Sequence, residues 1–160
     1  MRVSDVFGAL SAFAQAHIAL DQPFIDLLTR TAAQVSSAFE QTVDRGELTL
    51  DALFDTDYQE VAGSNPLQHT TRYNAVLDRL LPPLQEPVLG FDERIAFCAA
   101  VDRNGYLPTH NDKYSKPQRP DDPVWNAANC RNRRIFTDRT GRAAGANTAP
   151  FLIQSYLRDM

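Results

Sequence analysis

The stretch DRNGYLPTHNDKYSKPQ, residues 102–118, places a turn signal directly before a run of aromatic, imidazole and hydroxyl side chains. Asn104 and Gly105 are neighbours that tolerate the two positive φ angles of a type I′ turn at low cost. The run before them, IAFCAAV at 95–101, is apolar on both faces and too short for a typical helix, which indicates a buried strand. The sequence therefore predicts an antiparallel hairpin in the second half of the chain.

The predicted turn also decides which side chains of the hairpin share a face. With a two-residue loop, Arg103 pairs with Tyr106, so that Tyr106 and His110 lie on one face of the returning strand. Pro108 has no N–H group to donate to a sheet, which favours an edge position for this strand. The hairpin is therefore expected to present a tyrosine and a histidine side by side.

The first half of the chain has the periodicity of helices. Residues 24–43 carry apolar side chains at helical spacing and predict a helix of about five turns. Residues 3–20 form a shorter amphipathic segment, and we expect a second helix there, joined to the first near Asp21. Its small alanine side chains suit close helix contact, including contact with another chain. A third helix is predicted over 70–81, where two prolines end the pattern.

The remaining segments complete an α+β fold. Residues 47–68 are predicted to be a connector with one short helix, and residues 140–150 to be a flexible run. FLIQSYLR at 151–158 alternates in polarity and is a candidate for a last strand. Helices followed by antiparallel strands predict helices segregated to one side of a small sheet. We expect two parts, the helices at 1–46 and a sheet-containing domain at 47–160.

The composition is that of one ordinary globular domain. Of the 160 residues, 43% are hydrophobic and 22% are charged. No run reaches the roughly 18 to 20 consecutive apolar residues of a spanning helix, and the N-terminus lacks a signal-peptide pattern. We therefore expect a cytoplasmic chain without a membrane span. Cys98 and Cys130 are expected to be reduced, because a chain of this length does not need a disulfide to fold.

The formal charge of −4 is unevenly distributed along the chain. Residues 1–90 carry 5 basic and 12 acidic side chains, whereas residues 91–160 carry 11 basic and 8 acidic ones. Within residues 131–142, five arginines accompany a single acid, Asp138. These arginines either attract an anion or pair internally with the acidic half, and both interpretations stay open. Nucleic acid is not expected as a partner, because the chain is acidic overall and the basic tract is short.

No common catalytic motif is present, so we expect no enzyme. The sequence has no phosphate-binding glycine loop, HExxH, CxxC or GxSxG. Cys98 and His110 point to opposite faces in the predicted register, which argues against a nucleophile and its base. His69, His110 and Asp112 form at most a weak metal pattern. Aromatic side chains together with the histidine and the arginines instead favour a pocket for a small polar molecule.

Two motifs give the sequence a family resemblance. They are D-x-N-G-Y-x-P-x-H-N at 102–111 and N-R-x-x-F-x-D-R at 132–139. With LFDTDYQEVAGSNPLQ and LLPPLQEP upstream, they resemble the PAS-like or Cache-like cytoplasmic sensory region of some bacterial methyl-accepting chemotaxis proteins. The resemblance covers roughly residues 22–160, and the two motifs together are much more specific than either alone.

The resemblance implies a role in signal input and names no ligand. In the resembling proteins the region follows the coiled-coil signalling region, which is missing from this sequence. Relatives continue into further strands where this sequence stops at Met160, so we expect a PAS-like or Cache-like sheet without its last strands. Such an open edge would belong to a longer chain or be covered by a partner.

We therefore expect a signal-input domain of a chemotaxis-type receptor that binds a small polar or anionic ligand and forms a homodimer. Its further partner would be the chemoreceptor signalling region or another signalling protein. The alternatives are a haem or metal-based sensor that uses His110, and a dimerisation module without a ligand. The predicted ligand-binding residues are Tyr106, His110, Trp125, Arg133, Arg134, Asp138 and Tyr156.

Overall fold

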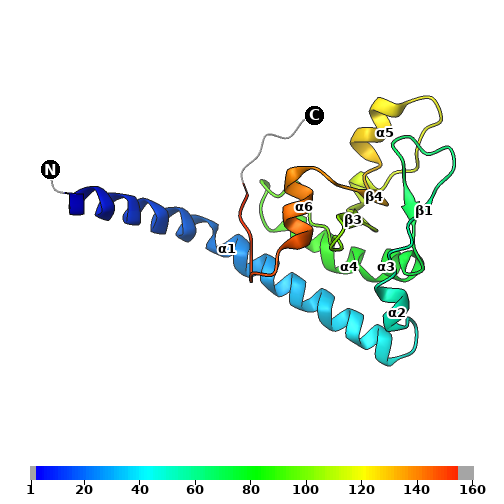
Figure 1. The fold of residues 1–160 in the computed structure, drawn as a ribbon, viewed down its shortest axis with the longest axis horizontal. Coiled ribbons are helices and arrows are strands. Elements are labelled where there is room, and N and C mark those ends of the chain that lie inside the picture. The colour runs from blue at the N-terminus through cyan, green and yellow to red at the C-terminus, as the bar shows by residue number, and fades with distance from the viewer. Residues whose placement is uncertain (1–2, 155–160) are drawn as a thin grey trace.

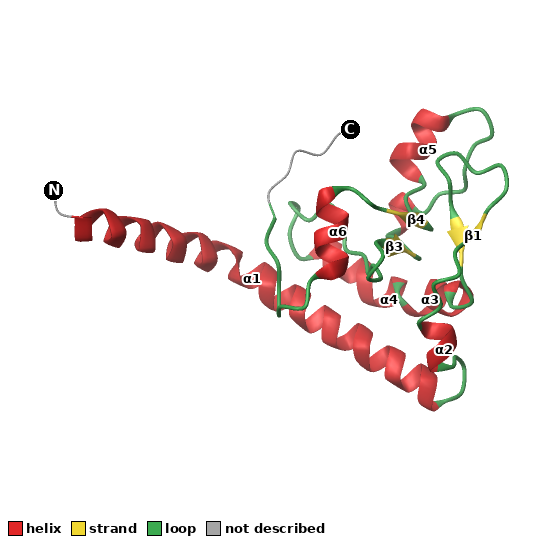
Figure 2. Ribbon diagram, in the orientation of Figure 1, coloured by secondary structure: helices red, strands yellow, loops and turns green. Residues whose placement is uncertain are grey.

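The computed structural model describes the backbone of residues 3–154 and the side chains of residues 21–154 (Figures 1 and 2). It combines helices with two short antiparallel strand pairs, which confirms the α+β class. In chain order the elements are α1 (Val3–Asp44), α2 (Leu50–Leu53), β1 (Gln59–Glu60), β2 (His69–Thr70), α3 (Asn74–Leu80), α4 (Pro82–Gln85), η1 (Glu86–Gly90), β3 (Tyr106–Leu107), η2 (Asp112–Tyr114), α5 (Pro123–Asn129), β4 (Arg134–Ile135) and α6 (Arg139–Ala146).

α1 is one continuous helix, so the predicted joint near Asp21 is wrong. Pro23 lies inside the helix, where it removes one backbone hydrogen bond without ending the element. The predicted end is confirmed, because Gly46 has a φ of 71° and its N–H donates to the Val43 carbonyl at 2.9 Å. The first half of α1 extends away from the other elements (Figure 1). Within residues 3–154, no helix is both long enough and apolar enough to cross a bilayer.

The hydrophobic core lies where the second half of α1 meets the later elements. Its buried members come from three parts of the chain, and the α1 side chains Val35 and Phe39 pack against them. The predicted boundary at residue 46 therefore passes between elements that share one core. The buried core residues are Leu48, Tyr73, Leu77, Leu81 and Tyr106.

The strands pair differently from the predicted hairpin. β1 pairs with β2, and β3 pairs with β4 through Tyr106 opposite Ile135 and Leu107 opposite Arg134. Residues 95–101 form no strand, so that prediction is wrong. The alanines of this run have weak strand propensity, and the Cys98 N–H donates to the Asn111 side-chain oxygen at 2.8 Å. Side-chain hydrogen bonding thus replaces a sheet partner for this segment.

The turn is one residue longer than predicted. The Asp102 N–H donates to the Tyr106 carbonyl at 2.9 Å, which leaves three residues in the loop. Gly105 has a φ of 81°, whereas Asn104 is not among the residues with a positive φ. A carboxylate oxygen of Asp102 accepts from the Asn104 N–H at 2.8 Å and from the Tyr106 N–H at 2.9 Å. This carboxylate closes the loop, so a type I′ pair is not needed.

The C-terminal segments also differ from expectation. The run predicted to be flexible, 140–150, is largely helical, because α6 extends from Arg139 to Ala146. α5 is a further helix that the sequence reasoning did not predict. Residues 151–154 have no regular secondary structure, and the rest of the strand candidate at 151–158 lies outside the described residues.

Candidate functional site

Tyr106 lies in the core rather than on a pocket wall. Its side chain is fully buried, and its hydroxyl donates to the His69 carbonyl at 2.9 Å and lies 3.0 Å from the Asn74 side-chain oxygen. Its ring packs against Tyr58 at 5.1 Å and Tyr73 at 6.2 Å between centroids. Burial raises the pKa of the Tyr106 hydroxyl, which keeps it a neutral donor.

His110 belongs to a different aromatic group. It is 2% exposed, its Nδ1 accepts from the Asn111 N–H at 2.7 Å, and its ring packs against Phe97 and Tyr114 at 5.2 and 4.9 Å. The ring contacts of Tyr106 and His110 thus go to different partners. Across the residues whose side chains are described, no three His, Cys, Asp or Glu side chains gather as a ligand set for a metal ion.

The backbone of Arg133 connects the two strand pairs. Its N–H donates to the Leu107 carbonyl at 2.6 Å, and its carbonyl accepts from the His69 N–H at 2.7 Å. Its guanidinium forms a 2.7 Å ion pair with Asp78 on α3, whose other carboxylate oxygen accepts from the Thr109 hydroxyl at 2.6 Å. This arginine therefore links the basic tract to the acidic half, as the internal-pairing interpretation predicted.

The other predicted site residues are dispersed. Arg134 donates to the Ala127 carbonyl at 3.3 Å, and burial lowers the pKa of its guanidinium. The Asp138 carboxylate caps α6 by accepting from two backbone N–H groups. The Trp125 ring stacks under the Arg119 guanidinium at 3.6 Å. Tyr156 lies outside the described residues. Each described member of the predicted site therefore has partners of its own within the fold.

Asp102 also bonds to a side chain that could not be predicted from the sequence. The Tyr58 hydroxyl donates to its Oδ2 at 2.5 Å, and the Asn104 amide donates to the same hydroxyl at 2.8 Å. Burial, followed by the bond to Asp102, raises the pKa of Tyr58 to about 12. Tyr58 lies 44 residues before Asp102, so no local motif could have indicated the pair.

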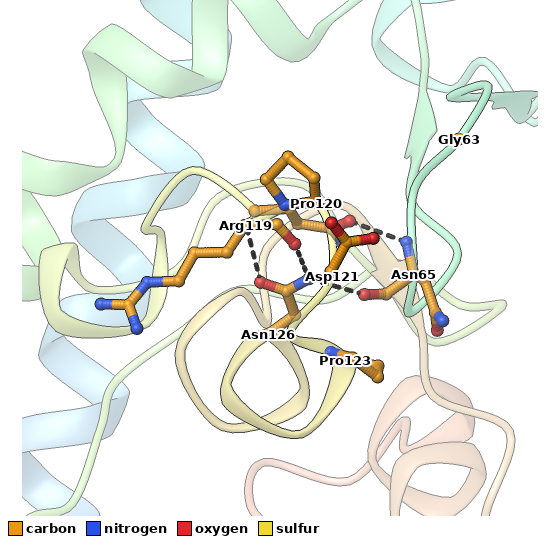
Figure 3. A pocket seen from close by; sticks show the side chains of 8 residues that line it. Gly63, Asn65, Arg119, Pro120, Asp121, Pro123 and Asn126 are labelled. Carbon is orange, nitrogen blue, oxygen red and sulfur yellow. Dashed lines mark hydrogen bonds between the residues drawn. The ribbon is translucent and has the colours of Figure 1, made fainter.

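A hollow of about 640 Å³ lies between two loops far apart in the sequence (Figure 3). One loop connects β1 to β2 and contributes Gly63 and Asn65, and the other is the 118–126 segment. The first loop lies in the connector predicted over 47–68, and nothing in the sequence predicts that it meets the 118–126 segment. The volume is within the usual range for sites that hold small molecules, and we take this hollow as the candidate site.

Two side-chain amides hold the loops together. Asn126 is 2% exposed, and its amide nitrogen donates to the Asn65 carbonyl at 3.0 Å and to the Arg119 carbonyl at 2.8 Å. Its oxygen accepts from the Arg119 N–H at 2.8 Å. The Gln118 amide accepts from the Asn65 N–H at 2.7 Å and donates to the Pro66 carbonyl at 2.8 Å. The walls of the hollow are thus fixed in place before any ligand binds.

Comparison with models of protein families, with curated proteins and with solved structures finds no match for this chain.

Proposed function

We propose that this chain is a non-enzymatic signal-input domain of the chemotaxis type, in which a small polar molecule binds in the hollow beside α5 and α1 transmits the signal. The observation that carries the proposal is the hollow itself. It has polar groups at its rim, and hydrogen bonds between Asn126, Gln118 and the opposite loop fix its walls.

The long helix supports the output half of the proposal. The second half of α1 packs against the core through Val35 and Phe39, while the first half extends away from the other elements (Figure 1). A helix anchored at one end in a ligand-binding domain can carry a small change in core packing to a distant partner, because packed helices shift as rigid units.

A fluorescence titration tests this proposal. Trp125 is the single tryptophan, and it stacks on Arg119, one of the residues that line the hollow. We expect at least one compound in a panel of small amines, amino acids, carboxylates and purines to change its emission and to raise the melting temperature of the full chain. If every compound leaves both unchanged at millimolar concentration, the ligand-binding function is wrong.

A dimerisation module without a ligand is the second candidate, and an apolar groove favours it. The groove has a volume of about 470 Å³ and lies between α1 and residues 150–154. Leu28, Phe151 and Ile153 line it and are each about half exposed. Open apolar surface of this kind typically marks contact with another protein. A homodimer with an unresponsive hollow would favour this candidate.

A further inference from the structure

The polar groups of the loops that wall the hollow bond mainly to one another. The Asn126 amide bonds to the backbone of Asn65 and Arg119, and the Gln118 amide bonds to the backbone of Asn65 and Pro66. Both N–H groups of the Asn126 amide are thereby used, and the Gln118 amide is already engaged by the opposite loop. Selection of a ligand therefore depends on the groups at the rim.

The rim presents a carboxylate without a basic partner. Asp121 lines the hollow and is exposed, and among residues 21–154 no basic group lies within 4.0 Å of its carboxylate. The Arg119 guanidinium is engaged by Trp125 and lies 3.6 Å from Asp122. Its side chain runs away from Asn65 and Asp121 (Figure 3). The charge that a bound molecule meets at the rim is therefore negative.

The other rim residues add apolar contact without further charge. Pro120, Pro123 and Gly63 have no polar side-chain atoms, and the Asn65 side chain is uncharged. A protonated amine would pair with Asp121 while its carbon chain packs against the proline rings. A carboxylate or phosphate would be repelled by Asp121, and the guanidinium of the lining residue Arg119 is already engaged by Asp122 and the Trp125 ring.

We infer that the hollow selects a small organic cation, a primary amine or diamine, over the anionic ligand that the arginine tract suggests. This inference rests on the proposed ligand-binding function and specifies the chemical class of its ligand. Asp121 is the residue that determines the selectivity, through an ion pair at the rim.

Three compounds with the same four-carbon chain test the charge preference directly. Putrescine, butanediol and succinate carry two positive, no and two negative charges, respectively. In amide-resolved NMR titrations of the full chain, we expect putrescine to shift the resonances of Gly63, Asn65 and Asp121, and the other two compounds to leave them in place. In Asp121→Asn, we expect the putrescine affinity to fall by about tenfold.

Glu93→Gln is the matched control, because Glu93 is an exposed acid outside the hollow and the substitution changes the net charge by the same amount. It should leave the putrescine affinity within about twofold. Equal weakening by both variants would mean a non-specific charge effect and would overturn the inference. Shifts with succinate or butanediol but not putrescine would overturn the amine selectivity and leave the ligand-binding function standing. No shift with any of the three would overturn the inference, while the broader fluorescence panel would still decide the proposed function.

Discussion

Gly105 is the residue of the 102–118 stretch whose identity the backbone restricts most tightly. Its φ of 81° is in the left-handed region, and an added Cβ would collide with the Phe136 carbonyl oxygen. We expect Gly105→Ala to lower the free energy of unfolding by about 2 kcal/mol or more, as measured by urea denaturation.

Gly46 provides the matched control for this substitution. Its φ of 71° is similar, but an added Cβ would meet nothing within 4 Å. Gly46→Ala should cost only about 1 kcal/mol, the cost of the left-handed conformation itself. Equal losses in the two variants would show that the contact with Phe136 does not restrict position 105.

Tyr58 gives the fold a dependence on alkaline pH. Its pKa in the folded chain is about 12, above the value of 10.0 for a free tyrosine. The folded state therefore holds the proton of the Tyr58 hydroxyl more tightly than the unfolded state does. The contribution of this hydroxyl to the free energy of unfolding is fully present below about pH 10 and is lost as the pH rises through about 12. We expect the melting temperature of the wild type to fall across this window.

Tyr58→Phe removes the titrating group and is the control. It should cost about 1 kcal/mol at neutral pH, because the hydrogen bond to Asp102 is lost, and it should show a weaker decline in alkali. The difference in tyrosinate absorbance between the two proteins reports the pKa of Tyr58 itself. An ordinary pKa for Tyr58 in that difference spectrum would exclude its part-buried hydrogen bond to Asp102.

Single residues show what the sequence could and could not predict. The need for glycine at position 105 was predictable from the local turn signal. The roles of Arg133 and Tyr58 were not, because each depends on a partner more than 40 residues away, Asp78 for Arg133 and Asp102 for Tyr58. The sequence shows Arg133 in a basic tract, whereas in the structure its backbone also forms hydrogen bonds to both strand pairs. The hollow could not be predicted either, because its walls come from two loops that are far apart in the sequence.

Among the elements, α6 shows how glycines can be misinterpreted. Two glycines in eight residues predict flexibility, yet both lie against other backbone segments. An added Cβ at Gly141 would come within 2.6 Å of the Phe136 carbonyl oxygen, and one at Gly145 within 2.8 Å of the Asp102 carbonyl oxygen. Gly145 therefore allows α6 to pack closely on the 102–105 turn, and Gly141 allows it to pack on the backbone of Phe136.

Whether Gly145→Ala stabilises or destabilises the chain tests this packing. Helix propensity alone predicts that Gly145→Ala stabilises the chain by about 1 kcal/mol. The close Asp102 carbonyl predicts the opposite, a loss of about 1 to 3 kcal/mol. We expect the loss in urea denaturation. A gain in stability would mean that α6 is not packed on the turn.

The substitution Ala144→Gly at an exposed position of α6 serves as the control, because it changes helix propensity alone and should cost up to about 1 kcal/mol.

Elements with long periodic patterns were predictable, as the helix over 24–43 and the end of α1 at Gly46 show. The strands were not, because β3 and β4 are two residues each and their register depends on the backbone of Arg133.

At the scale of the whole molecule, the second half of α1 packs on the core and the first half extends away from the other elements (Figure 1). The α1 face around Leu28 adjoins the groove bordered by residues 150–154, and Phe91, whose ring packs edge-on against Phe24, adds exposed apolar surface nearby. Exposed apolar side chains that gather in one place often mark contact with another protein. A second copy of the chain is the partner that we expect there, with α1 as the main contact and the segment after Pro150 as a weaker one.

The expected assembly is a homodimer joined through α1. Light scattering of the full chain at micromolar concentration should give twice the mass of the 17.9 kDa protomer. Deletion of residues 1–20 should yield a monomer or an aggregate, because it removes part of the expected contact. The domain itself should still fold, since the described α1 side chains that pack on the core, Val35 and Phe39, are retained. The substitution Leu28→Lys lies at an exposed position of the groove and should weaken the dimer without unfolding the domain. A charge that becomes buried at an interface is costly, whereas the same charge on an exposed surface is not.

A full chain that stays monomeric at high micromolar concentration would contradict the homodimer. The apolar face of α1 would then belong to contacts with a different protein.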